Sequence, residues 1–417
     1  MIHPILNLFS SPPMTSADHS PSPVPKLDEV PTPALASTEP SASSTHSPTS
    51  SSSQLPFSER PARRVRYSGT HPRGFQEKYK ELNPEKYAED IKKVLSRGQT
   101  PAGMHVPILW KEILDILKPS PGQVALDCTL GYGGHAEKIA EKLCPTGRLI
   151  GMDLDSEELR RSQQRLLDKG LPVSVHHSNF AGLVKIVQSE GLDGVDLLLA
   201  DLGVSSMQLD RPDRGFSFKH DGPLDMRLDR TRGQSAAQWL KTVKTDLLEE
   251  ILFELGDEPD AKAIAYAIKD AVEAESAPET TRDLLQLVFR AKGIDAKKFR
   301  RESAFHKHPA ARTFQAIRMT INREKANLEH LLRMLPSVLK PGGRAAILSF
   351  HSGERELVQK TFAEGLAKGW YSVGNHETIR PTHAEIYDNP RARSAHLHWV
   401  QRSGLSLENY SSTLVDH

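Results

Sequence analysis

The sequence predicts an α/β fold, a doubly wound Rossmann-like parallel sheet that carries an inserted all-helical subdomain. Short apolar runs typical of buried strands alternate with helical patterns between residues 124 and 201. The alternation stops after residue 232, and residues 233–303 carry helical patterns alone. An apolar strand pattern returns at residues 344–350. A helical segment therefore interrupts a sheet that later strands complete.

The first part of the predicted sheet domain covers residues 105–232. It opens with apolar residues at helical spacing from Ile108 to Leu117, and Pro119 ends this helix. Strand and helix patterns then alternate, as is typical of a parallel sheet. The predicted strands are 124–127, 148–153, 173–176 and 195–201, and the predicted helices are 136–143, 156–169 and 181–190.

The helical insertion is predicted over residues 233–303, with Trp239, Leu248 and Leu252 on one apolar face. The second part of the sheet domain covers residues 304–417. It begins with one long helix over 310–339, turns at Lys340-Pro-Gly-Gly343 and enters the strand 344–350. Further strands near the C-terminus are expected to complete the sheet.

Two segments precede the sheet domain. Residues 1–56 are rich in Ser and Pro and lack a periodic apolar pattern, which predicts a disordered tail. The tail has no arginine before Arg60, which disfavours a mitochondrial transit peptide. Residues 57–104 are a basic linker with a helix-like part, interpreted either as a solvated linker or as an RNA-binding arm.

Composition limits the function classes. The 54 basic and 53 acidic residues leave a net charge of +1, so nucleic-acid contacts must come from local patches. No run reaches the roughly 18 apolar residues of a membrane span, and no membrane partner is expected. Cys128 and Cys144 lack zinc or disulfide spacing, so we expect a cytoplasmic protein without a metal site.

A glycine-rich turn, Asp127-Cys-Thr-Leu-Gly-Tyr-Gly-Gly-His135, joins the first strand to its helix. Closely spaced glycines let the backbone approach a ligand at the start of a helix. Asp153 ends the next strand, where an acid accepts hydrogen bonds from ribose hydroxyls. The alternative is a tight turn that needs glycine for packing alone. The missing Gly-x-Gly-x-x-Gly pattern disfavours a nicotinamide dehydrogenase.

A second candidate site follows the strand that ends at Asp201. Open α/β sheets hold ligands at the carboxyl ends of their strands, which places this carboxylate at the predicted pocket. The loop beyond it contains Phe216 and Phe218, with Asp225 and Arg227 close behind. The phenylalanines are candidates to stack on a base, or alternatively anchors of the loop on the core. Asp225 and Arg227 are candidates for a local ion pair.

The motifs together resemble the bacterial RsmH (MraW) family over roughly residues 105–403. The residues that carry this resemblance form eight segments: Gly131-Tyr-Gly-Gly-His135, Asp201-Leu-Gly-Val-Ser-Ser-Met-Gln-Leu-Asp210, Arg214-Gly-Phe-Ser-Phe218, Asp221-Gly-Pro-Leu-Asp-Met-Arg227, Thr231-Arg-Gly-Gln-Ser-Ala-Ala237, Ala311-Arg-Thr-Phe-Gln-Ala-Ile-Arg318, Ser349-Phe-His-Ser352 and Asn389-Pro-Arg-Ala-Arg-Ser394.

The resemblance implies an S-adenosylmethionine-dependent methyltransferase of class I, acting on the exocyclic N4 of a cytidine in small-subunit ribosomal RNA. It also implies the residues that bind the methyl donor, which are Gly133, Gly134, His135, Asp153, Phe180, Asp201 and Gln208. One segment departs from the family. Where the family usually has Phe-His-Ser-Leu-Glu-Asp-Arg, this chain has Phe350-His-Ser-Gly-Glu-Arg-Glu356, which puts a role for the acidic–basic pair in doubt.

Asp201 is the candidate catalytic group. Methyl transfer to N4 needs an acceptor for the departing proton, and Asp201 either fills this role or only binds the donor. The candidate RNA-binding residues, each of which is alternatively a solvated surface group, are Phe216, Phe218, Arg214, Asp225, Arg227, His308, Arg312 and His351. The expected partner is small-subunit ribosomal RNA within the assembled or assembling subunit, with no DNA.

Two other readings remain open at this point. A methyltransferase acting on DNA, protein or a small molecule would have a similar site, and only substrate assays separate it from the ribosomal enzyme. An RNA-binding or assembly factor without turnover is disfavoured, since such a protein does not need a complete methyl-donor pocket. The target nucleotide and the oligomeric state do not follow from the sequence.

Overall fold

The fold is described from a computed structural model, which covers residues 106–295, 299 and 308–404. All of these belong to one compact unit within residues 66–417. The predicted tail 1–56, the predicted linker 57–104 and the end of the predicted insertion at 300–303 lie outside the described residues.

A seven-stranded sheet runs through the described part of the chain in the order β3-β2-β1-β4-β5-β7-β6. The first five strands pair in parallel, while β7 is antiparallel to both β5 and β6. The sheet is therefore mixed at its C-terminal edge. The strands are β1 Val124–Asp127, β2 Arg148–Asp153, β3 Val173–His177, β4 Val195–Asp201, β5 Leu339–Ser349, β6 Tyr371–Gly374 and β7 His396–Arg402.

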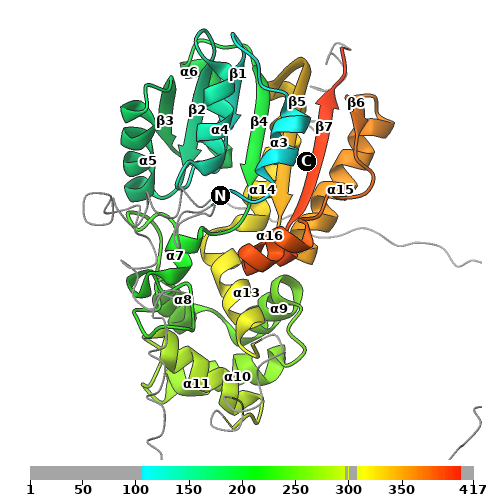
Figure 1. Ribbon diagram of the computed structural model, residues 1–417. Coiled ribbons are helices and arrows are strands. Elements are labelled where there is room, and N and C mark those ends of the chain that lie inside the picture. Colours follow the sequence, from blue (N-terminus) through cyan, green and yellow to red (C-terminus); the bar gives the residue numbers. More distant parts are fainter. Residues whose placement is uncertain (1–105, 296–298, 300–307, 405–417) are drawn as a thin grey trace, which may run out of the picture. The chain divides into compact units, whose positions relative to one another are not determined.

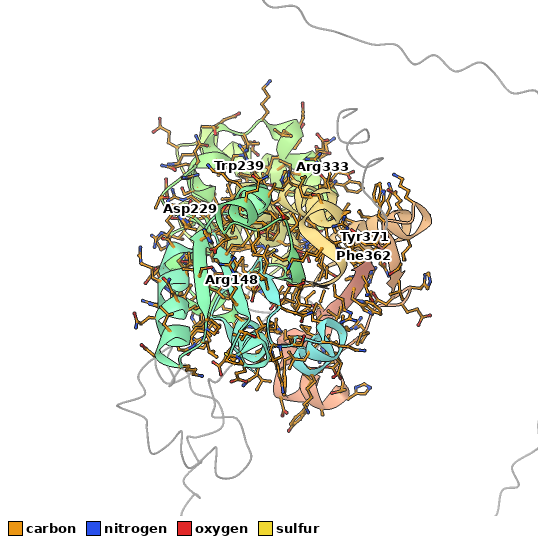
Figure 2. The ribbon with its side chains drawn as sticks, turned by 90° about the horizontal axis from the view of Figure 1, so that it is seen from above. Arg148, Asp229, Trp239, Arg333, Phe362 and Tyr371 are labelled. Atoms are coloured by element: carbon orange, nitrogen blue, oxygen red, sulfur yellow. The ribbon has the colours of Figure 1, made fainter. Side chains whose placement is uncertain are left out.

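Helices cover both faces of the sheet, as Figure 1 shows. One apolar core packs α3 Trp110–Leu117, α4 Gly134–Leu143 and α5 Ser156–Asp168 on one face. A second core packs α6 Leu183–Ser189, α14 Glu324–Val338 and α15 Ser352–Ala367 on the other. At the sheet edge, the rings of Phe362 on α15 and Tyr371 on β6 meet edge to face at 5.8 Å (Figure 2).

A third apolar core belongs to the helices that follow β4. It also encloses parts of the loop between residues 216 and 226, so loop and helices form one packed body. Figure 1 shows these helices at the end of the sheet toward which the arrows of β4 and β5 point. They are α8 Ala236–Thr242, α9 Thr245–Gly256, α10 Ala261–Glu273, α11 Thr281–Ala291 and α13 Ala311–Ile321.

The prediction of one long helix over residues 310–339 is wrong in one respect, because two helices occupy this segment. The helix is interrupted at Asn322 and Arg323, between α13 and α14. Arg323 adopts a left-handed conformation with a φ of 51°. The apolar spacing runs across the break without a glycine or proline to mark it. The break turns the side chain of Asn322 back to the 226–228 segment, where it bonds to the backbone of Met226 and Leu228.

Candidate functional site

A cavity of about 610 Å³ opens where the parallel strands end. Its wall combines segments that are far apart in the sequence, including the glycine turn, the ends of β2 and β4, the start of α15 and the segment near Asn389. All of the predicted donor-binding and catalytic residues line it, namely Gly133, Gly134, His135, Asp153, Phe180, Asp201 and Gln208. His351 also lines it.

The glycine turn is fixed in place by the strand beside it. The backbone N–H of Gly131 donates to Oδ2 of Asp153 at 2.7 Å, and the hydroxyl of Ser162 donates to the Gly131 carbonyl. Gly133 has a φ of 75°, which favours glycine, and caps the start of α4. A Cβ on Gly134 would lie 2.7 Å from Cγ of Pro107, another lining residue. The turn therefore presents bare backbone to the cavity.

Asp153 faces the cavity from the end of β2. Its two oxygens accept the N–H groups of Gly131 and Asp155, at 2.7 and 2.8 Å. Each carboxylate oxygen has a second lone pair, so a ribose hydroxyl can still donate to it. Burial raises the pKa of Asp153. Phe180, at the start of the short 3₁₀ turn Phe180–Gly182, packs against the sheet core and lines the cavity beside it.

Asp201 ends β4 and projects into the same cavity. Its backbone N–H donates to the hydroxyl of Thr129 at 2.6 Å, while its side chain remains 30% exposed. Burial, and then the charge of Glu354, raise the pKa of Asp201 to about 7. A carboxyl group with this pKa is half ionised at neutral pH and can accept a proton there. Burial likewise raises the pKa of Asp127 on β1 to about 6.

His135 lies between Asp201 and the chain that enters the domain. Its Nε2 is 2.9 Å from the carbonyl oxygen of Ile108, and its Nδ1 is 3.5 Å from Oδ2 of Asp201. Burial lowers the pKa of His135. The neutral ring that donates from Nε2 therefore turns the lone pair of Nδ1 toward Asp201.

Charged groups from α13 and α15 form the other side of the cavity. Glu354 is buried at the start of α15, and its Oε2 accepts the N–H of Phe350 at 2.8 Å. Nε2 of His351 lies 3.2 Å from Oε1 of Glu354, without hydrogen-bond alignment. Arg318 holds Glu324 through two bonds of 2.9 and 2.8 Å. Burial alone would raise the pKa of Glu354, but His351, the Phe350 N–H and Arg318 lower it.

Gln208 lines the cavity, yet its polar atoms are bonded within the protein. Its Oε1 accepts the N–H of Ser205 at 2.9 Å in a capping box that starts α7, Ser206–Asp210. Its Nε2 donates to Oδ2 of Asp155 at 3.0 Å. The side chain is 5% exposed. Gln208 thus fixes the wall of the cavity through the carboxylate of Asp155.

Two predicted RNA contacts do not reach the cavity. Phe216 is 5% exposed in the core of the helical subdomain, and a ring enclosed there has no free face for a base. Arg214 is 2% exposed and pairs with buried Asp155. For these residues the structure corrects the expected contact, because long-range packing partners occupy both side chains.

Five further predicted RNA contacts also lie outside the cavity wall. Phe218 stacks on His308 with ring centroids 4.0 Å apart, and both pack at the helical subdomain. Asp225 and Arg227 form a two-bond ion pair of 2.7 and 2.9 Å. Arg312 is exposed on α13. These positions shape or flank the subdomain rather than the cavity.

A chain of amides on the cavity wall does not follow from the sequence patterns. Nδ2 of Asn179 donates to Oδ1 of Asn327 at 3.1 Å, and Nδ2 of Asn327 donates to the carbonyl of Asn322 at 3.0 Å. All three line the cavity. The position of Asn179, directly before Phe180 at the end of a strand, was the one available signal. The other two depend on the break between α13 and α14.

Residues 106–295, 299 and 308–404 contain no group of three or more His, Cys, Asp or Glu side chains placed to hold a metal ion. No helix in this part of the chain is long and apolar enough to cross a membrane.

A doubly wound sheet with a glycine turn after its first strand, and acids after its second and fourth, is the architecture of a class I methyltransferase. A family model described as the MraW methylase family matches residues 102–403. The chain therefore belongs to the MraW methylase family. This membership confirms the predicted resemblance and the predicted methyltransferase class.

Individual relatives agree with the family match. The chain is 44% identical over 344 residues to ribosomal RNA small subunit methyltransferase H 1 of Agathobacter rectalis, covering 82% of this chain and 97% of the relative. It is 45% identical over 341 residues to the protein of the same name from Lachnoclostridium phytofermentans, covering 81% and 92%. Ribosomal RNA small subunit methyltransferase H 2 of Alkaliphilus metalliredigens is 46% identical over 345 residues, covering 82% and 98%.

Proposed function

We propose that this protein transfers a methyl group from S-adenosylmethionine to the exocyclic N4 of a cytidine in small-subunit ribosomal RNA. The observation that carries the proposal is the carboxyl group of Asp201, which shares one cavity with the glycine turn and Asp153. The names of the relatives support the ribosomal substrate.

The donor side of the cavity fits S-adenosylmethionine in shape and chemistry. The positive φ of Gly133 and the close contact of Gly134 with Pro107 leave bare backbone where a ligand chain can lie. Asp153 would accept hydrogen bonds from the ribose, and Phe180 would flank the adenine. The bound donor supplies an activated methyl group on a positively charged sulfur.

On the acceptor side, Asp201 is the proton acceptor. The N4 lone pair of cytosine is delocalised into the ring, so the amino group must lose a proton as it gains the methyl group. Ionised Asp201 accepts this proton at its Oδ atoms, and its raised pKa suits a base that works near neutral pH. Before the transfer, the same carboxylate orients the amino group by accepting a hydrogen bond from it.

Glu354 and Asp201 divide the electrostatic roles. Glu354 stays ionised because His351, the Phe350 N–H and Arg318 surround it, and its charge raises the pKa of Asp201. Pairs of acids with opposed pKa shifts are typical of catalytic sites. Nε2 of His351 is a buried ring nitrogen without a hydrogen-bond partner among the described residues. We assign it a hydrogen bond to the cytosine that receives the methyl group.

We further infer that the acceptor is presented by the small subunit in the cytoplasm, rather than by naked RNA. The support is the nearly balanced charge of the chain, with 54 basic and 53 acidic residues. A protein without a strong net field gains little from unspecific attraction to phosphates, so a shaped surface must supply recognition.

The test is methyl transfer from labelled S-adenosylmethionine to small subunits and to deproteinised RNA, followed by nucleoside analysis. We expect labelled N4-methylcytidine from the subunits, and its loss in Asp201→Asn and Asp201→Ala. The asparagine variant keeps the shape of the side chain but cannot accept the proton.

Donor binding without any labelled cytidine in either preparation would overturn the proposal. Label in deproteinised RNA at the same rate as in subunits would overturn the inference about presentation alone. Label in another nucleoside would keep the enzyme class and move the acceptor.

A further inference from the structure

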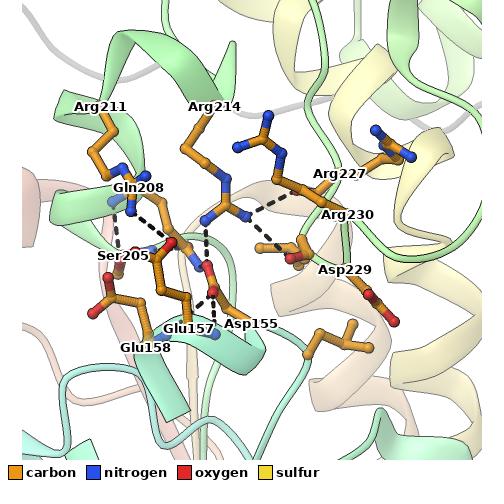
Figure 3. Close-up of polar contacts among 12 residues, drawn as sticks. Asp155, Glu157, Glu158, Ser205, Gln208, Arg211, Arg214, Arg227, Asp229 and Arg230 are labelled. Carbon is orange, nitrogen blue, oxygen red and sulfur yellow. Dashed lines mark hydrogen bonds and ion pairs between the residues drawn. The ribbon is translucent and has the colours of Figure 1, made fainter. Parts of the chain in front are cut away.

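A buried ion pair joins the donor side of the cavity to its acceptor side. Asp155 on the donor side is 3% exposed, and Arg214 is 2% exposed. Nη1 of Arg214 donates to Oδ2 of Asp155, as Figure 3 shows. The pair spans 59 positions of the sequence and connects the end of β2 to the loop after β4.

Asp155 is tied directly to the donor site. Its N–H donates to Oδ1 of Asp153 at 2.8 Å, and its own Oδ1 accepts the N–H groups of Glu157 and Glu158 at the start of α5. Its Oδ2 accepts a hydrogen bond from Nε2 of Gln208, which lines the cavity. Asp153, which we expect to bind the donor, is therefore one hydrogen bond away from the residue whose carboxylate holds Arg214.

Arg214 is tied to the part of the cavity lined by Leu228, Arg318 and Asn322, which we call the acceptor wall. Its Nη2 donates to the carbonyl oxygen of Arg227 at 3.0 Å (Figure 3). It also donates to the carbonyl oxygen of Leu228 at 3.1 Å. Leu228 lines the cavity, and its N–H donates to Asn322 on the same wall. The planar guanidinium reaches both partners because its donors point in fixed, divergent directions.

The loop that Arg214 closes stores strain. Met226 has a φ of 62°, a left-handed conformation that is unfavourable for a side chain of this kind. Its N–H donates to the Arg214 carbonyl, and its own carbonyl accepts Nδ2 of Asn322. Such a conformation persists only where the surroundings hold it. Without the Arg214 side chain, two of the bonds that hold the loop end are lost.

The pair is a poor choice for stability alone. Burial of two charges is unfavourable unless all their bonding groups are satisfied, and Nε of Arg214 is buried without a partner. A buried pair that keeps such an unfavourable feature, and bonds to both sides of a binding cavity, indicates a functional role.

We propose that the Asp155–Arg214 pair couples methyl-donor binding to the order of the loop from Gly215 to Asp229, so that the donor prepares the acceptor wall. Arg214 is a positioning residue in this scheme. The inference rests on the proposed function only in taking S-adenosylmethionine as the donor.

The test uses the product S-adenosylhomocysteine as a probe, with calorimetry for its affinity and hydrogen–deuterium exchange for the loop. In the wild-type chain we expect the probe to slow exchange of loop amides roughly tenfold, as for a moderate coupling between sites. The double variant Asp155→Asn/Arg214→Met leaves no unpaired buried charge and keeps a helix-capping side chain. At probe concentrations that saturate the variant, we expect the slowing of loop exchange to be lost.

Arg211→Gln is the matched control. Arg211 lies three positions before Arg214 and also joins this segment to α5, through Glu157, but on a more exposed path. We expect normal slowing of loop exchange in this variant. Arg214→Lys keeps the charge without the forked donors, and we expect it to lose most of the slowing.

Three results would overturn the inference. The first is slowing in the double variant equal to that of the wild type. The second is probe binding to the wild type with no change in loop exchange. The third is loss of probe binding in the double variant, because the pair would then belong to the donor site itself. Failure of the wild type to bind the probe would instead contradict the proposed function.

Discussion

Nδ1 of His135 lies 3.5 Å from Oδ2 of Asp201, while Nε2 of the same ring lies 2.9 Å from the carbonyl oxygen of Ile108. The carbonyl can only accept, so Nε2 carries the proton and Nδ1 presents a lone pair to the carboxyl group. His135 can therefore accept a hydrogen bond from Asp201 once Asp201 is protonated, which stabilises the carboxyl group after it has taken up the proton. A residue predicted to bind the donor thus also contacts the predicted proton acceptor.

Replacement of His135 by Phe should lower kcat about tenfold, a small part of the effect typical of general base catalysis. The ring volume is roughly kept, but protonated Asp201 loses the nitrogen that accepts its hydrogen bond. The measurement is single-turnover methyl transfer, with S-adenosylhomocysteine affinity followed by calorimetry. His330→Phe on α14, outside the cavity wall, is the control and should keep the wild-type rate. A fall in affinity that matches the fall in rate would assign His135 to donor binding alone.

The rate should rise with pH and reach half its maximum near pH 7, the pKa to which burial and Glu354 raise Asp201. The ionised form is the base, so activity is lost as the pH falls below this value. Glu354→Gln removes a negative charge that raises this pKa, and we expect the midpoint to move to lower pH. The measurement is a pH–rate profile under saturating donor and acceptor.

Glu356→Gln serves as the control for this profile, because Glu356 is a largely exposed acid near the same end of α15. Its midpoint should equal that of the wild type. A midpoint that stays in place or moves to higher pH in Glu354→Gln would remove Glu354 from the electrostatics of Asp201.

Particular residues show which features of the fold and the site can be predicted from the sequence. The parallel strands and the carboxylates Asp153 and Asp201 follow from apolar runs and from what ends them, which are local features. The partner of Arg214 lies 59 positions away, so the local sequence predicts an RNA contact for an arginine that is buried in the structure. The break at Arg323 lacks any glycine or proline signal, and the wall that contains Asn322 and Asn327 depends on it.

Arg214→Met alone should destabilise the fold by about 3–5 kcal/mol, because it leaves the buried carboxylate of Asp155 without its cation. Addition of Asp155→Asn should recover most of this loss. The measurement is the free energy of unfolding in urea for the wild type, both single variants and the double variant. A double variant as unstable as the sum of the single variants would show that the two side chains do not interact energetically.

Phe218→Ala should destabilise the protein by about 3 kcal/mol, since the ring stacks on His308 and meets Phe314 edge to face. The affinity for small subunits, measured under conditions where the variant is folded, should stay near the wild-type value. A base-stacking role for Phe218, the alternative predicted from the sequence, would instead give a stable variant with weakened binding to small subunits.

Gly133→Ala should weaken S-adenosylhomocysteine binding about tenfold, which corresponds to roughly 1.4 kcal/mol. An alanine at a φ of +75° is strained. Its Cβ would also lie 3.2 Å from Nη2 of Arg165, whose guanidinium group stacks on the ring of Tyr132 in the cavity wall. The control is Gly170→Ala, which has a φ of +71° with no atom within 4 Å of the added Cβ. It shares the backbone strain but lies away from the cavity, so it should lose stability and keep its affinity. Calorimetry on both variants separates the two effects: equal losses of affinity would mean that backbone strain, and not the shape of the glycine turn, governs donor binding.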